Sequence, residues 1–312
     1  MNQDKIIHFY EKRKIFFAIS ISIFVIGIIA LFINGVQLDI QFKGGALLKY
    51  TYTDTVDEYV AGDIVSGVLG RPVTTQLTED ITTGDQKIIF NIAGKSGVDV
   101  KDQQLFDDEL KQRFPESNLN LSEASMVEPF FGQRFLRRGM LSILIAGILV
   151  MLYVWIRFKM MGGLSAGAMA LVALLHDVLV VFFTCVIFKI PIGDSFVAVA
   201  LSIIGYSIND TIVIYDRIRE NSNTYVGIEI ETLTNLSITQ SMMRSVMTNV
   251  AVIISVSIVY LLAFTNGIDS IQSFALPMAI GSISGCYSTI CIAGPLWVMW
   301  KKRKGAGTLF SK

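Results

Sequence analysis

Six apolar segments dominate this chain of 312 residues, and each is long enough to cross a lipid bilayer. A membrane-spanning helix needs about 20 mainly apolar residues. The composition agrees with this pattern, because 52% of the residues are hydrophobic and only 17% are charged. The sequence therefore predicts a polytopic α-helical membrane protein. The six predicted transmembrane helices cover Ile15–Ile33, Gly139–Ile156, Leu164–Phe188, Ser195–Tyr215, Val246–Thr265 and Ile271–Trp300.

Basic residues around these segments indicate the orientation of the chain in the membrane. The first segment follows Lys12-Arg13-Lys14 and is not followed by a convincing small-residue cleavage site, so we expect an uncleaved anchor. Basic residues also follow the second segment and form the tail at Lys301–Lys304, whereas the loops after the third and fifth segments hold almost none. Because positive charge collects on the cytoplasmic side, both termini are expected there. Arg134, Arg137 and Arg138, on the outer side, depart from this rule.

A polar stretch between the first two segments has the pattern of a small α+β domain. Runs rich in β-formers cover 47–53, 72–79, 86–92 and 119–127, and helical stripes cover 56–69 and 100–114. A hairpin-like turn at Thr83-Gly84-Asp85 separates the second and third strands. The order β-α-β-β-α-β is that of the split, ferredoxin-like unit. The predicted domains are a cytoplasmic N-terminus with the first helix (1–34), the outer domain (35–133), transmembrane helices two to six (134–300) and a basic cytoplasmic tail (301–312).

Two carboxylates lie inside the predicted membrane helices, where an ionisable group costs at least ~2.5 kcal/mol. Asp210 is in the fourth helix, next to Asn209 and one turn from Ser207, and Asp177 is in the third helix. Such groups usually face the interior of a bundle and serve ion or proton pathways. Arg244, at the start of the fifth helix, is the cation best placed to reach Asp210. A carboxylate that alternates between a protonated state and an Arg-paired state is the simplest proton switch that these residues allow.

The same polar residues also have a plainer interpretation. Asn209 and Asp210 could only hydrogen-bond between helices and hold the bundle together, at about 1 kcal/mol per bond. His176 precedes Asp177 directly, and neighbours on a helix point about 100° apart, so the two side chains cannot share one face. We expect Asp177 to face inward and leave the direction of His176 open.

Other classes of function lack the residues that they need. The sequence holds no phosphate loop, no nucleophile with a base and no Cys or His spacing for a metal, so we expect neither an enzyme nor a bound cofactor. Work must then come from an ion gradient, and the residues around Asp210 allow H⁺ or Na⁺ as the coupling ion. Most acidic residues lie between 39 and 138, which argues against nucleic-acid binding there. Glycines expected to let helices pack closely are Gly163, Gly167, Gly205, Gly281 and Gly285.

Three motifs resemble the SecF family, the smaller partners of SecD in bacterial Sec protein export. They run from Gly205 to Asn221, from Leu175 to Val178 and from Gln240 to Thr248, and the six spans with one large loop after the first also match. The resemblance implies a half-transporter of the resistance-nodulation-division type in the bacterial inner membrane, which uses the proton motive force with SecD to promote preprotein translocation. The family's intramembrane Asp and Arg, which are implied to carry the proton flow, fall on Asp210 and Arg244. From the residues themselves we add Asn209 and Asp177 to the predicted proton pathway, with His176, Ser207 and Thr248 in support.

The resemblance also implies partners, and one motif departs from it. The implied partners are SecD, the SecYEG channel, YajC and translocating preproteins, within a lipid bilayer. The family has a D-F-x-G-G motif after the first span, whereas this chain has Gln41 before Phe42, Gly44 and Gly45, with Asp39 two residues earlier. This departure puts the role of the motif carboxylate in doubt. Two alternatives stay open: a structural assembly subunit without its own ion coupling, and a half-transporter that exports lipids or small molecules.

Overall fold

The computed structural model describes residues 6–39, 45–53, 55–79, 86–93, 98–127, 129–266 and 268–305. Within these residues, six helices are long and apolar enough to cross a membrane. The first five are α1 (Arg13–Asn34), α5 (Pro129–Arg157), α6 (Gly163–Ile187), α7 (Asp194–Thr224) and α8 (Ile230–Thr265). The sixth span joins α9 (Asp269–Ser288), a π-helical segment (Thr289–Ala293) and α10 (Gly294–Arg303). The predicted polytopic helical class is confirmed.

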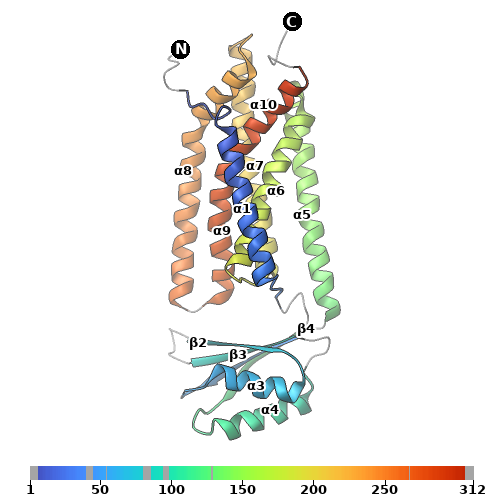
Figure 1. The fold of residues 1–312 in the computed structure, drawn as a ribbon, viewed down its shortest axis with the longest axis vertical. Helices are drawn as coiled ribbons and strands as arrows, with labels where there is room; N and C mark the ends of the chain where they lie inside the picture. Colours follow the sequence, from blue (N-terminus) through green and yellow to red (C-terminus); the bar gives the residue numbers. More distant parts are fainter. Residues whose placement is uncertain are drawn as a thin grey trace.

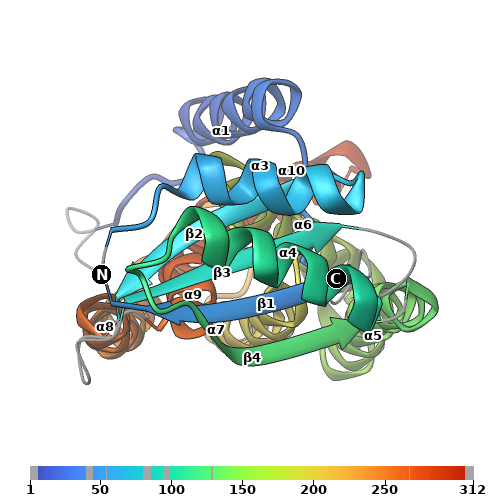
Figure 2. The ribbon, with the colours of Figure 1, turned by 90° about the horizontal axis from the view of Figure 1, so that it is seen from below.

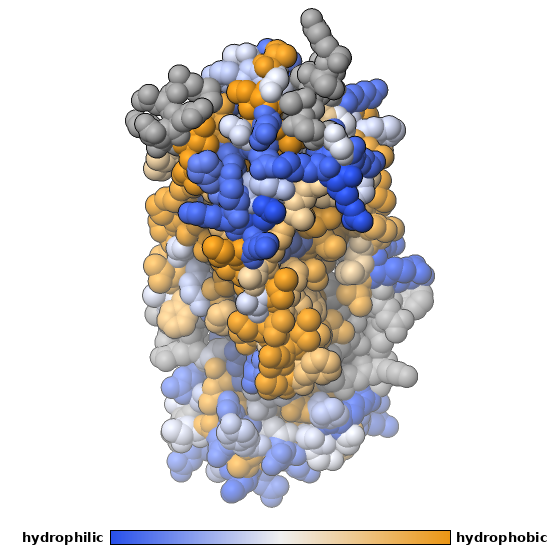
Figure 3. Space-filling view, turned by 45° about the horizontal axis from the view of Figure 1, so that its top comes forward, coloured by the Kyte–Doolittle hydropathy of each residue, from blue (hydrophilic) through white to orange (hydrophobic). Residues whose placement is uncertain are grey.

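The sixth span, α6 and α7 form the centre of the bundle, and α1, α5 and α8 lie around them (Figure 1). In the most apolar part of each span, 67%, 61% and 50% of the residues are buried for the three central helices, against 11% to 17% for the other three. The outer helices expose many Ile, Leu and Val side chains, which contribute to the apolar band in Figure 3. Such a surface is stable against lipid or another apolar protein surface.

The α/β unit between α1 and α5 is a four-stranded sheet with two helices on one face (Figures 1 and 2). The strand order is β2-β3-β1-β4, and every neighbouring pair is antiparallel. Alternate residues of β1 point towards the helices, so Leu48 and Tyr50 are buried with Phe90 and Phe106. Along the chain the elements are β1 (Gly45–Tyr52), α3 (Glu58–Leu69), β2 (Val73–Glu79), β3 (Gln86–Ala93), α4 (Val100–Arg113) and β4 (Asn120–Val127).

The observed strands and helices follow the predicted ones, but several helices are longer than predicted. Helix α5 begins at Pro129 and not at Gly139, α7 continues to Thr224 beyond Tyr215, and α10 continues to Arg303 beyond Trp300. Helix α8 runs unbroken from Ile230, so the polar segment before the fifth span belongs to the same helix, because no Gly or Pro interrupts it. The turn predicted at Thr83–Asp85 lies outside the described residues.

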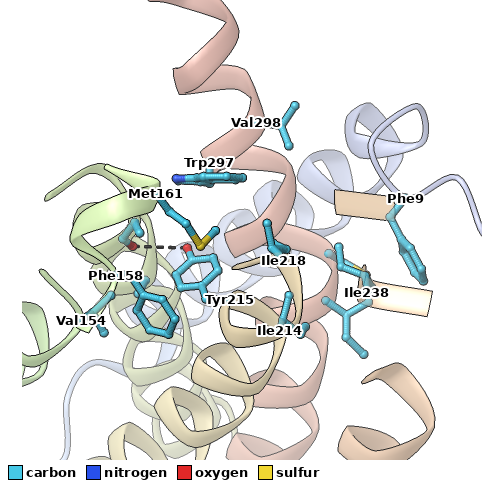
Figure 4. Close-up of a cluster of buried hydrophobic side chains, with 14 of the residues drawn as sticks. Phe9, Val154, Phe158, Met161, Ile214, Tyr215, Ile218, Ile238, Trp297 and Val298 are labelled. Atoms are coloured by element: carbon cyan, nitrogen blue, oxygen red, sulfur yellow. Dashed lines mark hydrogen bonds between the residues drawn. The ribbon is translucent and has the colours of Figure 1, made fainter. Parts of the chain in front are cut away.

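An aromatic cluster packs the end of the bundle where α1 begins and α10 ends (Figure 4). Tyr215 of α7 and Trp297 of α10 have no exposed surface, and their ring centroids lie 6.2 Å apart. Phe158 meets the Tyr215 ring edge to face at 5.7 Å. The Tyr215 hydroxyl donates to the carbonyl oxygen of Ala166 at 3.3 Å, which joins α7 to α6. This packing fixes the position of α7 along the bundle axis, and with it the polar residues one to two turns away.

Candidate functional site

Asp177 has no exposed surface and lies where α6 meets α7 and α9. Three hydroxyls donate to its carboxylate: Ser207 of α7 at 2.7 Å, and Ser284 and Ser288 of α9, each at 2.6 Å. A buried carboxylate needs several donors to remain stable. Asp177 therefore joins three central helices through one group. The sequence predicted an inward Asp177 but not its partners, because serines are common in membrane helices and Ser284 and Ser288 are more than a hundred residues away.

His176 is also buried, although the sequence left its direction open. Its Nδ1 lies 3.2 Å from Asp177 Oδ1, and its ring packs against Phe24 of α1 and Tyr287 of α9, with centroids 5.2 Å and 5.9 Å away. Two adjacent residues face inward because neighbouring helices surround α6 on several sides. His176 Nε2 has no hydrogen-bond partner within the described residues.

Asp210 is the second buried carboxylate of the bundle, with only 5% of its surface exposed. Asn249 Nδ2 of α8 donates to Asp210 Oδ2 at 2.7 Å, and the hydroxyl of Ser245 lies near the same carboxylate. The sequence analysis did not single out Asn249 or Ser245, although both lie on α8 within one turn of Arg244 or Thr248. Asp210 borders a narrow cleft, too tight to hold a water molecule, whose other lining residues are Ile203, Tyr206, Ser207, Asn249, Gly281, Ser282 and Gly285.

Arg244, the expected partner of Asp210, does not contact it. Its side chain is exposed, and within the described residues no ion pair joins the two groups. The charge of Arg244 is nevertheless close enough to act on Asp210 through space. The separation has a geometric cause. Ser245 and Asn249 occupy the buried face of α8, so Arg244 and Thr248 point to the exposed one.

Asn209 and Thr248 lie on exposed surfaces of the same two helices. Asn209 forms no hydrogen bond in the part of the chain that the structure describes, and Thr248 donates back to the carbonyl oxygen of Arg244 at 2.9 Å. Tyr206, one turn before Asp210 on α7, is 47% exposed at the edge of the cleft. The predicted pathway residues thus divide into a buried group and an exposed group.

The pair Gly163 and Gly167 lets α6 approach α5 closely, as its spacing predicted. A Cβ on Gly163 would lie 2.2 Å from the backbone oxygen of Trp155, and one on Gly167 would lie 3.1 Å from that of Met151. Backbone atoms cannot move aside as the end of a flexible side chain can. A methyl group at Gly163 would therefore force the two helices apart.

The second glycine pair packs against α7, whereas Gly205 meets none of the residues that the structure describes. A Cβ on Gly281 would lie 2.8 Å from Ile203, and one on Gly285 would lie 3.3 Å from Ser207 Cβ. Gly285 therefore brings α9 next to the serine that bonds Asp177. Gly205 is exposed, and a Cβ there would meet no described atom within 4 Å. Among the described residues Gly205 does not have the packing role expected of it, because it lies on the outer surface of α7.

The segment that leads into the α/β unit is only partly described. The backbone N–H of Asp39 donates to the carbonyl oxygen of Ile192 at 3.0 Å, and its side chain lies against Gly193 before α7. Gly45 begins β1 with a φ of +145°. Gln41, Phe42 and Gly44 lie outside the described residues.

Comparison with known proteins assigns the family. The family model described as "Protein export membrane protein SecD/SecF, C-terminal" matches residues 107–303. The protein translocase subunit SecF of Petrotoga mobilis is 31% identical over 302 residues, covering 96% of this chain and 97% of that protein. The SecF of Alicyclobacillus acidocaldarius is 32% identical over 292 residues, covering 92% and 91%. The chain belongs to the SecF family. Its relatives in this family are named as translocase subunits and not as enzymes, in agreement with the sequence analysis.

Two solved structures share the fold of this SecF-family chain. SecDF from Thermus thermophilus has a TM-score of 0.79 at 24% identity and covers 97% of the chain. SecDF in a super-membrane-facing form has a TM-score of 0.66 at 24% identity and covers 96%. The chain spans only 40% and 39% of those SecDF chains. The likeness therefore shows that this chain shares its fold with about two fifths of the SecDF chains.

Proposed function

We propose that this chain is the SecF half of a SecD–SecF complex that uses the proton motive force to promote preprotein translocation across the bacterial inner membrane. One observation carries the proposal: Asp210 is buried in the middle of a membrane helix, and among the described residues its hydrogen bond comes from the neutral amide of Asn249. A carboxylate in such surroundings must be protonated or paired with a cation. Arg244 is the cation whose charge acts on it. Asp210 can therefore bind a proton in one state and release it when Arg244 approaches.

Asp177 supports this site in a different way. Three hydroxyls donate to its carboxylate, so the group is satisfied as an ion and would lose a partner on protonation. We assign it the role of holding Ser207, which lines the Asp210 cleft, while His176 holds Asp177 in turn. Asn209 and Thr248 lie on exposed surfaces of α7 and α8, where they can meet a partner subunit.

The missing partner is SecD, because the chain corresponds to two fifths of a SecDF chain. SecD would cover part of the exposed apolar surface of the bundle. In the proposed orientation both termini and the basic residues around α10 face the cytoplasm, and the α/β unit faces outward. Its βαββαβ order and its strand order support a ferredoxin-like outer domain. There it would work on preproteins leaving the SecYEG channel, with YajC as a further partner.

The test is preprotein export into membrane vesicles that contain SecD and either this chain or its Asp210→Asn variant, with and without an imposed proton gradient. We expect the variant to assemble with SecD and to lose the gradient-dependent part of export only. Asp216→Asn is the matched control, since Asp216 is on the same helix but forms exposed ion pairs with Arg157 and Arg219.

Three other results would contradict the proposal. Equal stimulation of both proteins by the gradient would make Asp210 a structural residue. A uniform loss of export together with a weakened complex would favour a structural assembly subunit. Stimulation by a sodium gradient and not by a proton gradient would assign Na⁺ as the coupling ion.

A further inference from the structure

We propose that the end of the bundle opposite the α/β unit holds a binding site for the phosphate headgroup of an anionic phospholipid, built by Lys301 of α10 and the first turn of α6. The site lies at the corner where the connection between α5 and α6 meets α10 (Figure 1). It does not depend on the proposed ion coupling, because neither Asp210 nor the residues that contact it take part.

Lys301 is the cation at the centre of this corner. Its Nζ lies over the ring of Trp297, 5.8 Å from the centroid, and beside Gly162, where a Cβ would come within 2.5 Å of it. The side chain is half-buried, and within the described residues no carboxylate lies within ion-pair distance of it. The neighbouring charge that acts on it is that of Lys304, which has the same sign. Among the described residues Lys301 is therefore a partly desolvated cation without an anion.

The first turn of α6 adds a second positive group. Helix α6 begins at Gly163, after Gly162 in the left-handed conformation with a φ of +78°. The N-terminal end of a helix carries a partial positive charge and unpaired backbone N–H groups, so it attracts anions and repels a cation such as Lys301. Phosphate is a ligand that suits such a helix end. An anion between Lys301 and α6 would satisfy both groups at once.

A buried donor below Lys301 also has no acceptor. Trp297 has no exposed surface, and its Nε1 forms no hydrogen bond within the described residues. Figure 4 shows this nitrogen on the edge of the ring towards Met161, which directly precedes Gly162. A buried N–H group without an acceptor destabilises the protein. The ammonium group, the helix N-terminus and the indole N–H therefore meet at one corner, and each of them calls for an anionic oxygen.

The apolar surroundings of this corner favour a phospholipid over a free phosphate ion. Leu164 in the first turn of α6, Ile156 at the end of α5 and Trp300 beside Lys301 all expose large apolar side chains. Tryptophan collects at the membrane–water interface, so Trp300 and the exposed Trp155 place the corner at the level of the headgroups. Acyl chains can lie against these side chains while the phosphate meets Lys301.

The charge balance of this corner selects an anionic headgroup. Among the described residues Lys159 and Lys304 are exposed and have no acidic partner, and the one carboxylate of Asp216 is shared by Arg157 and Arg219. Positive charge is therefore in excess on this side of α10. A zwitterionic headgroup carries its own cation and would gain little from this excess, whereas an anionic headgroup is attracted by it.

The test is quenching of tryptophan fluorescence in vesicles that contain the purified chain. The three tryptophans of the chain, Trp155, Trp297 and Trp300, all lie near this corner. Phospholipids brominated on their acyl chains quench a tryptophan that they contact. We expect brominated phosphatidylglycerol to quench more strongly than brominated phosphatidylcholine at equal mole fraction. Lys301→Gln should lower the relative affinity for phosphatidylglycerol about fivefold, the contribution of one lysine at an anionic surface.

Lys302→Gln is the matched control. Lys302 follows Lys301 on α10 but is paired with Glu231 of α8, so its replacement should leave the relative affinity unchanged. Lys301→Arg keeps the charge and should keep the preference for phosphatidylglycerol. Equal losses in Lys301→Gln and Lys302→Gln would indicate a diffuse attraction by the basic end of the chain, and they would overturn the site.

Inorganic phosphate distinguishes the two sources of the anion. An excess of it at constant ionic strength should leave the quenching by brominated phosphatidylglycerol unchanged, because it has no acyl chain to contact Leu164 and Trp300. Relief of the quenching would assign the site to free phosphate and contradict the lipid. Equal quenching of the wild type by both phospholipids would also overturn the inference. If Lys301→Gln does not fold, Lys159→Gln should lower the relative affinity in the same direction, and an unchanged affinity in that variant would refute the site.

Discussion

Replacing Asp177 with alanine removes the acceptor that Ser207, Ser284 and Ser288 share. All three serines are buried, with 6% exposure or less, so water does not replace the lost oxygen atoms. Each buried hydroxyl without an acceptor costs about 1–3 kcal/mol. The three together would cost about 3–9 kcal/mol if none found another partner.

Two of the three serines have a fallback partner, which lowers this figure. Ser288 is already 3.2 Å from the carbonyl oxygen of Gly285, and Ser284 is 3.5 Å from His176 Nδ1. Both contacts are longer than the bonds to Asp177. We therefore expect Asp177→Ala to lower the free energy of unfolding by about 3–5 kcal/mol, near the lower end of the range.

The assay is unfolding of the SecD complex in detergent, followed by the loss of tertiary structure with added denaturant. Asp177→Asn keeps one acceptor oxygen and should lose about half as much stability as Asp177→Ala. Asp210→Asn is the control at the other buried carboxylate. Asp210 accepts a hydrogen bond from Asn249, whereas Asp177 accepts three from serines, so this variant should lose only about 1 kcal/mol of unfolding free energy. A loss below about 1 kcal/mol in Asp177→Ala would refute the view that this carboxylate joins the three helices.

Two further predictions concern packing and pH. Gly163→Ala should destabilise the protein by about 1–3 kcal/mol, because its methyl group would meet the backbone of Trp155. Gly205→Ala should leave the stability of the isolated chain unchanged. Equal losses of stability in both variants, measured by unfolding in detergent, would contradict the packing argument. In the α/β unit, burial and the hydrogen bond to Asp107 raise the pKa of Tyr50 above its usual value. Folding then favours neutral Tyr50, so its contribution is complete below the unfolded pKa of about 10 and is lost as the pH rises above it. Limited proteolysis of the α/β unit should accelerate above about pH 10 in the wild type and less in Tyr50→Phe; an equal acceleration in both would contradict this assignment.

The sequence alone determined the elements of this protein and the identity of its central carboxylate. Hydrophobic runs of spanning length, and the alternation of period two or 3.6 in the α/β unit, are local patterns, because they follow from helix and strand geometry. Asp210 was visible for the same reason, since a carboxylate within a long apolar run is anomalous without any knowledge of its neighbours. The glycine pair at 163 and 167 could be interpreted from its spacing.

Only the tertiary structure decided which polar groups meet. Asn249 lies 39 residues from Asp210, and Ser284 and Ser288 lie more than a hundred residues from Asp177. Which serine or asparagine faces a given carboxylate depends on the rotation and axial position of each helix, and these are set by packing across the whole bundle. The same rotation of α8 that brings Asn249 to Asp210 turns Arg244 to the exposed surface, so the predicted partner and the observed one lie about 140° apart around one helix.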